Sequence, residues 1–560
     1  MPASSPDPYY YLANFERAIR WVAERSDDLL DADERAFIRD FSLLPRASRA
    51  LLVRMVMRRG SLFRTARLVY EEIGCPLAAS APLCAHGWLD AAPLLTLDDV
   101  FRLVTKVELA HVFPDRRAVL RGRKSDALDS LRRDHPDARP YAQWHPTADD
   151  AVLQVTIGAR VDRLRLLFFG NLHQDWSEFV LADLGVFQYE QVAFERSSRA
   201  FQCRADVDAY LVLHACRETL ELLGTAHDDD AFDALLHVAM SDTDITAAST
   251  RANSWLAHRR DKLLFRLGQH CERRQDWTRA LAVYQGSAYP GARHRRMRVL
   301  ERAGRPDAAL ALARVALDAP ESDAEAQRVA RMLPRLHRAL GTPLARQPAA
   351  PRLAKTRLVL PRPSGPFSVE RIACEALAEP GTVVHYVENA LLNSLFGLLC
   401  WDAIFAAVPG AFFHPFQSGP ADLHAPDFAA RRTPWFAAAL AQLDGEDYKA
   451  TILRHFHAKA GLQSPFVFWG WLTDDLLQLA LRCLPAAHLK RCFERLMVDV
   501  VANRTGFPDL IRFWPEEGRY EMVEIKGPGD RLQDNQLRWL AYCAAHDMPM
   551  RVVHVEWEAA

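Results

Sequence analysis

Several features that mark common protein classes are missing from this 560-residue chain. No apolar run approaches the ~20 residues that a membrane-spanning helix requires, and the start of the chain, residues 1–7, lacks the pattern of a secretory signal peptide. The ten cysteines are scattered without a C-x-x-C pair, so neither a disulfide framework nor a zinc finger is indicated. A G-x-x-x-x-G-K phosphate loop is also missing, which argues against ATP-driven movement. We therefore expect a reduced, cytoplasmic, bacterial protein with no membrane partner.

A strong net charge is missing as well, but basic residues are unevenly distributed. Residues 41–70 contain seven arginines and no Asp or Glu, and residues 251–310 contain fourteen Lys or Arg against five acidic residues. Clustered basic side chains attract a phosphate backbone, although many arginine runs are only solvated helix faces. We expect DNA contact from the first cluster more than from the second. The candidate DNA-binding residues are Arg46, Arg49, Arg54, Arg58, Arg59 and Arg64.

The chain is too long for a single hydrophobic core, so about three or four domains are expected. Residues 1–245 have the apolar spacing of amphipathic helices. Residues 246–342 change to short paired helices that resemble degenerate tetratricopeptide repeats. Residues 343–369 contain six prolines and are interpreted as a linker into a C-terminal domain at 370–560. The fold class expected is thus multidomain and mostly helical, with a distinct C-terminal domain.

Within that last domain, Pro508-Asp509 is followed by Glu524-Ile525-Lys526. Residues 519–526 alternate apolar and polar as a half-buried strand does, so Glu524 and Lys526 share a face. The turn signal at 515–518 folds this strand back on the run that Asp509 opens, which predicts a hairpin. Two adjacent carboxylates and a lysine suit metal-dependent phosphodiester hydrolysis. In an isolated E-x-K, a surface lysine at a strand end would be the better interpretation of Lys526, and only the other residues of the group reverse this preference.

Glu388, upstream of this motif, and Gln536, downstream of it, fit the same chemistry. The apolar spacing around Glu388 predicts an amphipathic helix over 382–399, with this carboxylate on or beside its apolar stripe. A buried glutamate is costly unless it is paired or binds a metal, so the alternative is a buried arginine partner. Gln536 shares a predicted helix face with Leu532, Trp539 and Leu540. It would either orient an active-site group or cap a backbone carbonyl.

The motif around these residues resembles a known nuclease family. Residues 523–532, Asn535-Gln536 and Trp539-Leu540 resemble the virus-type replication–repair nuclease (VRR-NUC) domain, and residues 395–405 and 506–510 narrow the match to the Fanconi-associated nucleases. This resemblance implies an α/β domain of the PD-(D/E)XK, restriction-endonuclease-like type at 370–560, and a SAP-like module in the N-terminal region. By motif, the implied metal ligands are Glu388, Asp509, Glu524 and the Ile525 carbonyl, with Lys526 as the catalytic lysine and Gln536 assisting.

The resemblance also implies an activity and partners. Oxygen ligands suit one or two Mg²⁺ or Mn²⁺ ions. The family implies a 5′-flap endonuclease and 5′-to-3′ exonuclease that acts on branched or flapped DNA in interstrand crosslink repair, nucleoid-associated when on DNA, as a monomer or a DNA-induced dimer. The ubiquitin-binding zinc finger of animal members has no counterpart here.

Alternatives stay open at this point. One is a four-way-junction resolvase, which would need a symmetric dimer, and another is a non-catalytic helical-repeat scaffold with a relict nuclease fold. The aromatic group Phe466, Phe468, Trp469 and Trp471 also has two interpretations. It would stack on splayed bases or, as we favour, pack in the core.

Overall fold

A computed structural model describes residues 7–558, apart from 177–186, 225–227, 242–248, 250–251, 343–354, 363–364 and 366. The chain forms two compact units, residues 1–186 and 187–560. Part of the expected linker, 343–354, lies outside the described residues. None of the helices in the described part of the chain combines the length and apolar character needed to span a bilayer.

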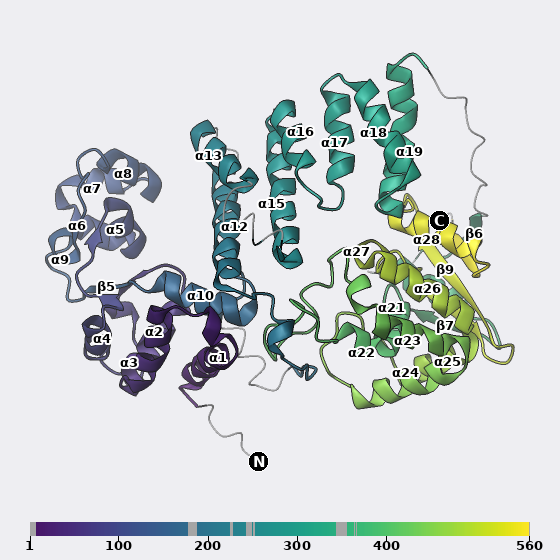
Figure 1. Cartoon of the computed structure of the whole chain (residues 1–560), viewed down its shortest axis with the longest axis horizontal. Helices are drawn as coiled ribbons and strands as arrows, with labels where there is room; N and C mark the ends of the chain where they lie inside the picture. The colour runs from purple at the N-terminus through teal and green to yellow at the C-terminus, as the bar shows by residue number, and fades with distance from the viewer. Residues whose placement is uncertain are drawn as a thin grey trace. The chain divides into compact units, whose positions relative to one another are not determined.

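The first unit is helical with two small antiparallel sheets (Figure 1). A buried aromatic group that includes Phe15, Phe37 and Phe41 joins its first helices. Asp31 begins the second helix with a capping box to Glu34, which explains the start of that helix. Its elements are α1 (Tyr10–Ser26), α2 (Ala32–Leu43), α3 (Arg46–Val56), β1 (Leu62–Arg64), α4 (Pro76–Ala85), β2 (Leu89–Asp90), β3 (Leu94–Leu95), α5 (Leu97–Leu103), α6 (Lys106–Val112), α7 (Arg117–Leu120), α8 (Lys124–Leu131), β4 (Arg139–Pro140), α9 (Tyr141–Trp144), β5 (Val152–Val155) and α10 (Gly158–Phe169).

The second unit opens with a row of helices that stand side by side (Figure 1). Close packing is visible at Gly268, where a Cβ atom would lie only 2.5 Å from the Tyr284 ring. The helices of this row are α12 (Arg204–Leu223), α13 (Asp229–Met240), α15 (Ser254–Arg273), α16 (Trp277–Gln285), α17 (Ala292–Arg302), α18 (Pro306–Asp318) and α19 (Asp323–Ala339).

A five-stranded mixed sheet follows, in the order β6-β10-β9-β8-β7. The outer strand β6 lies within the segment 343–369. Strand β10 is parallel to β6 and β9, whereas β8 is antiparallel to both β9 and β7. The strands are β6 (Lys355–Leu360), β7 (Val383–Tyr386), β8 (Leu510–Trp514), β9 (Arg519–Lys526) and β10 (Met550–Trp557). The mostly helical chain with a C-terminal sheet is confirmed.

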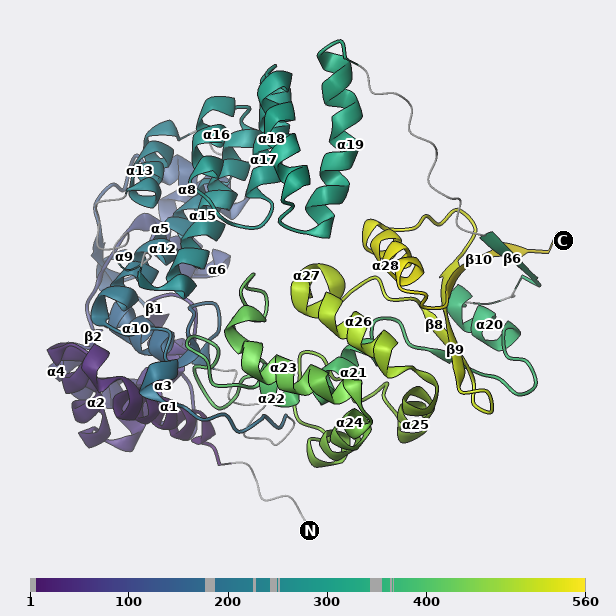
Figure 2. The same cartoon turned by 45° about the vertical axis from the view of Figure 1, so that its right-hand side comes forward.

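Helices cover both faces of this sheet (Figure 2). Val523 and Ile525 pack toward α20, whereas Met522 belongs to the larger core that includes Trp539 of α28. Because side chains alternate along a strand, Glu524 and Lys526 share the α28 side with Met522. The helices of this region are α20 (Val369–Ala376), α21 (Leu391–Leu399), α22 (Trp401–Ile404), α23 (Thr433–Ala441), α24 (Asp447–Ala458), α25 (Asp474–Cys483), α26 (Ala486–Val498), α27 (Val500–Asn503) and α28 (Asp534–Ala545).

Candidate active site

The predicted hairpin is confirmed, and it brings two carboxylates and a lysine together. Asp509 immediately precedes β8, and its Oδ2 accepts a hydrogen bond of 2.8 Å from the Ile525 N–H on β9. Glu524 is fully buried on β9, and its Oε1 lies 2.7 Å from the Lys526 Nζ. The ladder pairs Leu510 with Val523, so these groups meet at the same end of the hairpin.

Burial makes this cluster electrostatically unfavourable. Desolvation raises the pKa of Asp509 and of Glu524, and the neighbouring Asp509 charge raises the pKa of Glu524 further. Lys526 opposes both shifts without cancelling them. The Glu524 Oε2 is buried and makes no hydrogen bond in the described part of the chain. An oxygen atom in this situation, beside a second carboxylate, fits a divalent cation.

Gln536 contacts the cluster from α28. Its amide Nε2 donates to the Glu524 Oε1 at 2.5 Å, and its own Oε1 accepts from the Gln533 N–H at 2.8 Å. This second bond belongs to the capping box that begins α28. The residue therefore caps the helix by accepting from an N–H, where a carbonyl was the predicted partner, and it also donates a hydrogen bond to the Glu524 carboxylate.

Glu388 differs from its prediction. Residues 383–386 form strand β7 and α21 begins only at Leu391, so Glu388 lies in an exposed turn and not on a buried helix face. The apolar spacing of three to four residues was misleading because it runs across two different elements. Residues 383–386 pair with β8, whereas Leu391 and Leu392 belong to the next helix. Turn residue Asn389 has φ of +51°.

The turn nevertheless points toward the cluster. The Val387 N–H donates to the Asp509 carbonyl at 2.8 Å, and the Asn389 Oδ1 accepts from the Phe507 N–H at 3.1 Å. The Glu388 charge contributes to the raised pKa of Asp509. Among the described residues, however, no three His, Cys, Asp or Glu side chains converge as a metal-binding group. The structure thus joins Asp509 and Glu524 and leaves Glu388 beside the pair.

Glu370 was missed by sequence reasoning. It lies half-buried in the first turn of α20, and its charge raises the pKa of Asp509 more than that of Glu388 does. The Ser368 Oγ donates to its carboxylate at 2.6 Å. No motif marks this position, because only the packing of α20 against β9 brings it near the hairpin.

The candidate DNA-binding arginines of the first unit divide into two groups. Arg64 is buried and pairs with Asp150 at 2.8 Å and with Glu108 at 2.5 Å, Arg54 pairs with Glu72, and Arg49 pairs with Glu16. These three arginines are each paired with an acidic side chain of the same unit, so part of their charge is neutralised within the fold. Arg46 is exposed and its guanidinium lies over the Tyr9 ring.

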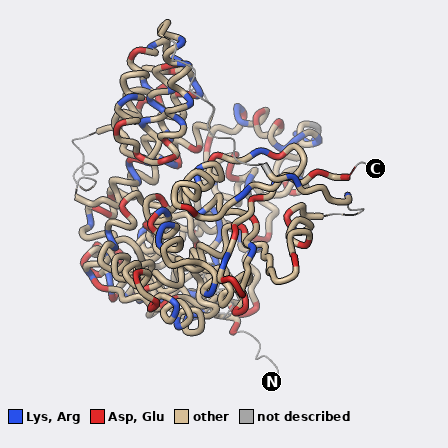
Figure 3. The backbone as a smooth tube through the Cα atoms, turned by 90° about the vertical axis from the view of Figure 1, so that its right-hand side faces the viewer, with Lys and Arg blue, Asp and Glu red and all other residues tan. Residues whose placement is uncertain are grey.

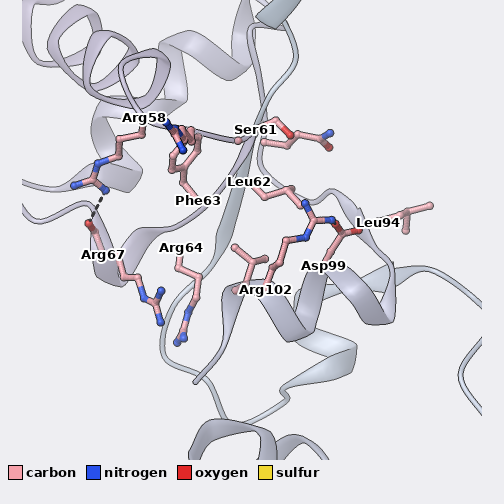
Figure 4. Close-up of a pocket in the computed structure, with 13 residues that line it drawn as sticks. Arg58, Ser61, Leu62, Phe63, Arg64, Arg67, Leu94, Asp99 and Arg102 are labelled. Atoms are coloured by element: carbon pink, nitrogen blue, oxygen red, sulfur yellow. Dashed lines mark hydrogen bonds and ion pairs between the residues drawn. The ribbon is translucent and has the colours of Figure 1, made fainter. Parts of the chain in front are cut away.

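The two remaining candidates, Arg58 and Arg59, line a hollow of about 570 Å³ between β1 and α5 (Figure 4). Arg67 and Arg102, which were not among the candidates, line the same hollow. All four are exposed. Arg102 contacts Asp99 at 2.6 Å, and the Arg58 guanidinium donates to the Arg67 carbonyl at 3.3 Å. The arginine run without acids at 41–70 thus contains both exposed arginines and arginines that are paired within the fold.

The second basic cluster is also partly neutralised within the fold. Arg293 donates to Glu325 at 2.9 Å and Arg295 to Glu272 at 3.3 Å. Figure 3 shows the two signs interleaved along most of the chain, in agreement with the net charge of −1. Local basic runs in the sequence therefore overstate the positive surface.

Comparisons with known proteins find related families and sequences. Family models match residues 9–90 (FAN1, HTH domain), 94–144 (Fanconi anemia-associated nuclease SAP domain) and 444–557 (VRR-NUC domain). The Fanconi-associated nuclease 1 homolog of Pseudomonas aeruginosa is 52% identical over the whole chain and 98% of that protein. The Arabidopsis thaliana homolog is 25% identical over 96% of the chain and 65% of that protein.

Solved structures match at the level of the whole fold. A crystal structure of paFAN1 bound to 2nt 5′flap DNA with gap has a TM-score of 0.90 and 52% identity, covering all of both chains. A second, of paFAN1 bound to 1nt 5′flap DNA with gap, has a TM-score of 0.88 and covers 99% of this chain and 100% of that one.

Proposed function

The chain belongs to the Fanconi-associated nuclease family, and from this premise we propose that it is a metal-dependent, structure-selective DNA nuclease. One observation carries the proposal: the buried pair Asp509 and Glu524, with an unpartnered carboxylate oxygen and Lys526 beside it. A cluster that is this unfavourable in isolation is typical of a site built for a bound cation or reacting group.

We assign the roles as follows. Asp509, Glu524 and the Ile525 carbonyl would hold one or two Mg²⁺ or Mn²⁺ ions, with Glu388 contributing from the turn before α21. A bound ion supplies an acidified water and neutralises charge on the phosphate oxygens. Lys526 presents its ammonium group to the phosphate, and Gln536 keeps the Glu524 carboxylate in one orientation. The aligned ladder of β8 and β9 preorganises these groups.

The substrate proposed is DNA with a 5′ flap. The two similar structures are described as paFAN1 bound to 5′flap DNA, which supports flap cleavage here. We extend this to 5′-to-3′ exonuclease activity and to interstrand crosslink repair on the family resemblance. The arginine-lined hollow of Arg58, Arg59, Arg67 and Arg102 would contact the phosphate backbone. The enzyme would act at the nucleoid, as a monomer or a DNA-induced dimer.

The proposed domain organisation keeps the boundaries expected from the sequence. A helical DNA-binding region at 1–245 precedes tetratricopeptide-like repeats at 246–342, a linker at 343–369 and the nuclease domain at 370–560. The row α15 to α19 supports the repeats, because consecutive helices pack as pairs. The mixed sheet with carboxylates at the end of a β8–β9 hairpin supports a PD-(D/E)XK domain.

The test uses end-labelled 5′-flap, 3′-flap, four-way-junction and plain duplex DNA with Mn²⁺, Mg²⁺ or EDTA. Asp509→Asn removes one carboxylate, and Glu517→Gln removes an exposed carboxylate in the β8–β9 turn as a matched control. Metal-dependent 5′-flap cutting that Asp509→Asn abolishes and Glu517→Gln retains is expected. Symmetric nicking of the junction would favour a resolvase, and binding without cutting would favour a scaffold.

A further inference from the structure

The loop between α24 and α25 exposes two aromatic rings beside the active site. Phe466 is fully buried, and Trp469 is half-buried with its Nε1 donating to the Leu462 carbonyl at 2.7 Å. Phe468 and Trp471 in the same loop are 37% and 55% exposed. Core packing, favoured from the sequence for all four residues, therefore accounts for Phe466 and Trp469. It leaves the exposed rings of Phe468 and Trp471 without a role in the core.

The loop that carries these rings is firmly attached to α21, the helix that follows Glu388. The Phe468 N–H donates to the Ser394 Oγ at 3.1 Å, and the Arg504 guanidinium donates to the Pro465 carbonyl at 2.8 Å. The backbones also approach closely, because a Cβ atom on Gly397 would lie 2.7 Å from the Phe466 Cβ. An exposed ring on such a base loses little conformational entropy when a ligand stacks on it.

Two contacts connect the exposed Trp471 to Glu388 of the candidate metal site. Its ring centroid lies 5.6 Å from that of Tyr386, and the Tyr386 hydroxyl donates to the Glu388 carboxylate. Burial and this hydrogen bond raise the pKa of Tyr386, and the charges of Glu388 and Asp509 raise it further. One ring contact and one hydrogen bond thus connect Trp471 to Glu388 through Tyr386.

The chemistry of Trp471 fits a nucleobase better than a side chain of the same protein. Tryptophan is highly buried on average, and proteins that bind single-stranded nucleic acid use aromatic side chains as platforms on which bases stack. Stacking is tolerant of base identity, as a structure-selective enzyme requires.

We propose that Trp471 is a substrate-positioning residue, on which an unpaired base of the cut strand stacks next to the scissile phosphate. The proposal rests on the nuclease function proposed above, because it assigns an unstacked nucleotide to the same site. Tyr386 would hold the ring and link its position to Glu388. Trp471 itself would not take part in bond breaking.

The experiment combines protein variants with single abasic substitutions in a 5′-flap substrate, one position at a time across the junction. Trp471→Leu removes the flat face but keeps apolar bulk over Tyr386, and Trp471→Phe restores a smaller face. Trp435→Leu on α23 is the matched control, because Trp435 is 44% exposed and lies on a helix outside the loop between α24 and α25. Full-length proteins are compared by KM, by kcat with Mn²⁺ and by Tm.

Loss of the stacking face is expected to raise KM about 5- to 100-fold, with a smaller change in kcat. In the wild-type enzyme one abasic position should reproduce this loss, and the same position should have no further effect in Trp471→Leu. Trp471→Phe should recover most of the affinity, and Trp435→Leu should equal wild type.

Two results would overturn the inference while leaving the proposed function intact. One is wild-type KM in Trp471→Leu on an enzyme that cuts the flap normally. The other is an abasic substitution that, at every position, raises KM by the same factor in Trp471→Leu as in wild type. Such additive effects of the protein change and the DNA change mean that the ring and the base do not touch. If Trp471→Leu lowers Tm, its KM is set aside. The KM values of Trp471→Phe and wild type on the abasic substrates then decide whether the ring contacts the base. Failure of the wild-type enzyme to cut any flap would instead refute the proposed function.

Discussion

Replacing the Glu524 carboxylate by its amide should stabilise the fold while it abolishes cleavage. The side chain is fully buried, and desolvation together with the Asp509 charge raises its pKa, although Lys526 lies 2.7 Å away. Each pKa unit of upward shift corresponds to about 1.4 kcal/mol in favour of the neutral form. Glu524→Gln has the same shape and carries no charge, so it should raise the free energy of unfolding by about 1–3 kcal/mol near pH 8.

The pH dependence follows from the sign of the shift. A carboxyl whose pKa is raised in the folded state destabilises the fold when it is forced to ionise, so its cost is present above the folded pKa and vanishes below the unfolded pKa of about 4.3. The stability difference between Glu524→Gln and wild type should therefore be large in mildly alkaline solution. It should shrink as the pH falls through the folded pKa toward about 4.

Thermal or urea unfolding in EDTA, followed across this pH range, measures the difference. Glu517→Gln is the matched control, because that carboxylate is exposed in the β8–β9 turn and should show almost no effect. Added Mn²⁺ should stabilise wild type by about 2.7 kcal/mol at a hundredfold excess over Kd and should stabilise Glu524→Gln far less. A variant that is less stable than wild type at pH 8 in EDTA, or a difference that does not vary with pH, would refute the reasoning.

Three further predictions concern Tyr386, Asn389 and the two groups of arginines in the first unit. Tyr386→Phe removes the hydroxyl that donates to Glu388 and should raise the Mn²⁺ concentration needed for half-maximal cleavage, with little change in the rate at saturation; an unchanged metal titration would contradict this role. Asn389→Ala should cost about 1–2 kcal/mol in unfolding measurements, because φ of +51° is strained for alanine and the bond to the Phe507 N–H is lost, whereas Asn389→Gly should lose only the bond. Arg58→Ala should weaken DNA binding and reduce the magnitude of its log–log salt slope by roughly one in affinity titrations. Arg54→Ala, which breaks the pair with Glu72, should instead lower Tm, and the reverse pattern would show that the two arginine groups are assigned wrongly.

The hairpin that brings these side chains together could be predicted from the sequence because it is local. Asp509, Glu524 and Lys526 lie within eighteen residues of one another, and the alternation along β9 decides which of them share a face. Gln536 was singled out because it shares a helix face with Trp539 and Leu540, and in the structure the start of α28 places its amide against Glu524.

The turn at Glu388 could not be predicted in the same way. Strand β7 and helix α21 are separated by only four residues, and their combined apolar spacing imitates one amphipathic helix. Only the pairing of β7 with β8, more than a hundred residues away in sequence, separates the two elements. Glu370 depends likewise on the long-range packing of α20 against β9.

The arginines show a different limit. A run such as 41–70 reveals positive charge but not the acids that neutralise it, and Arg64 finds Asp150 eighty-six residues further along the chain. Exposure of Arg58, Arg59, Arg67 and Arg102 results from the fold around the hollow (Figure 4). Composition therefore marks a positively charged stretch of sequence but does not tell which of its arginines are exposed.

The central claim is that the Asp509–Glu524–Lys526 cluster cuts DNA, and single-turnover cleavage of a 5′-flap substrate by Lys526→Ala tests it most directly. Lysine removal should slow cleavage by roughly 10²- to 10⁴-fold at saturating Mn²⁺, while the Kd for the flap, measured in Ca²⁺, and the Tm stay close to wild type. Cleavage at the wild-type rate by a folded Lys526→Ala protein would contradict the account and place the chemistry elsewhere in the chain.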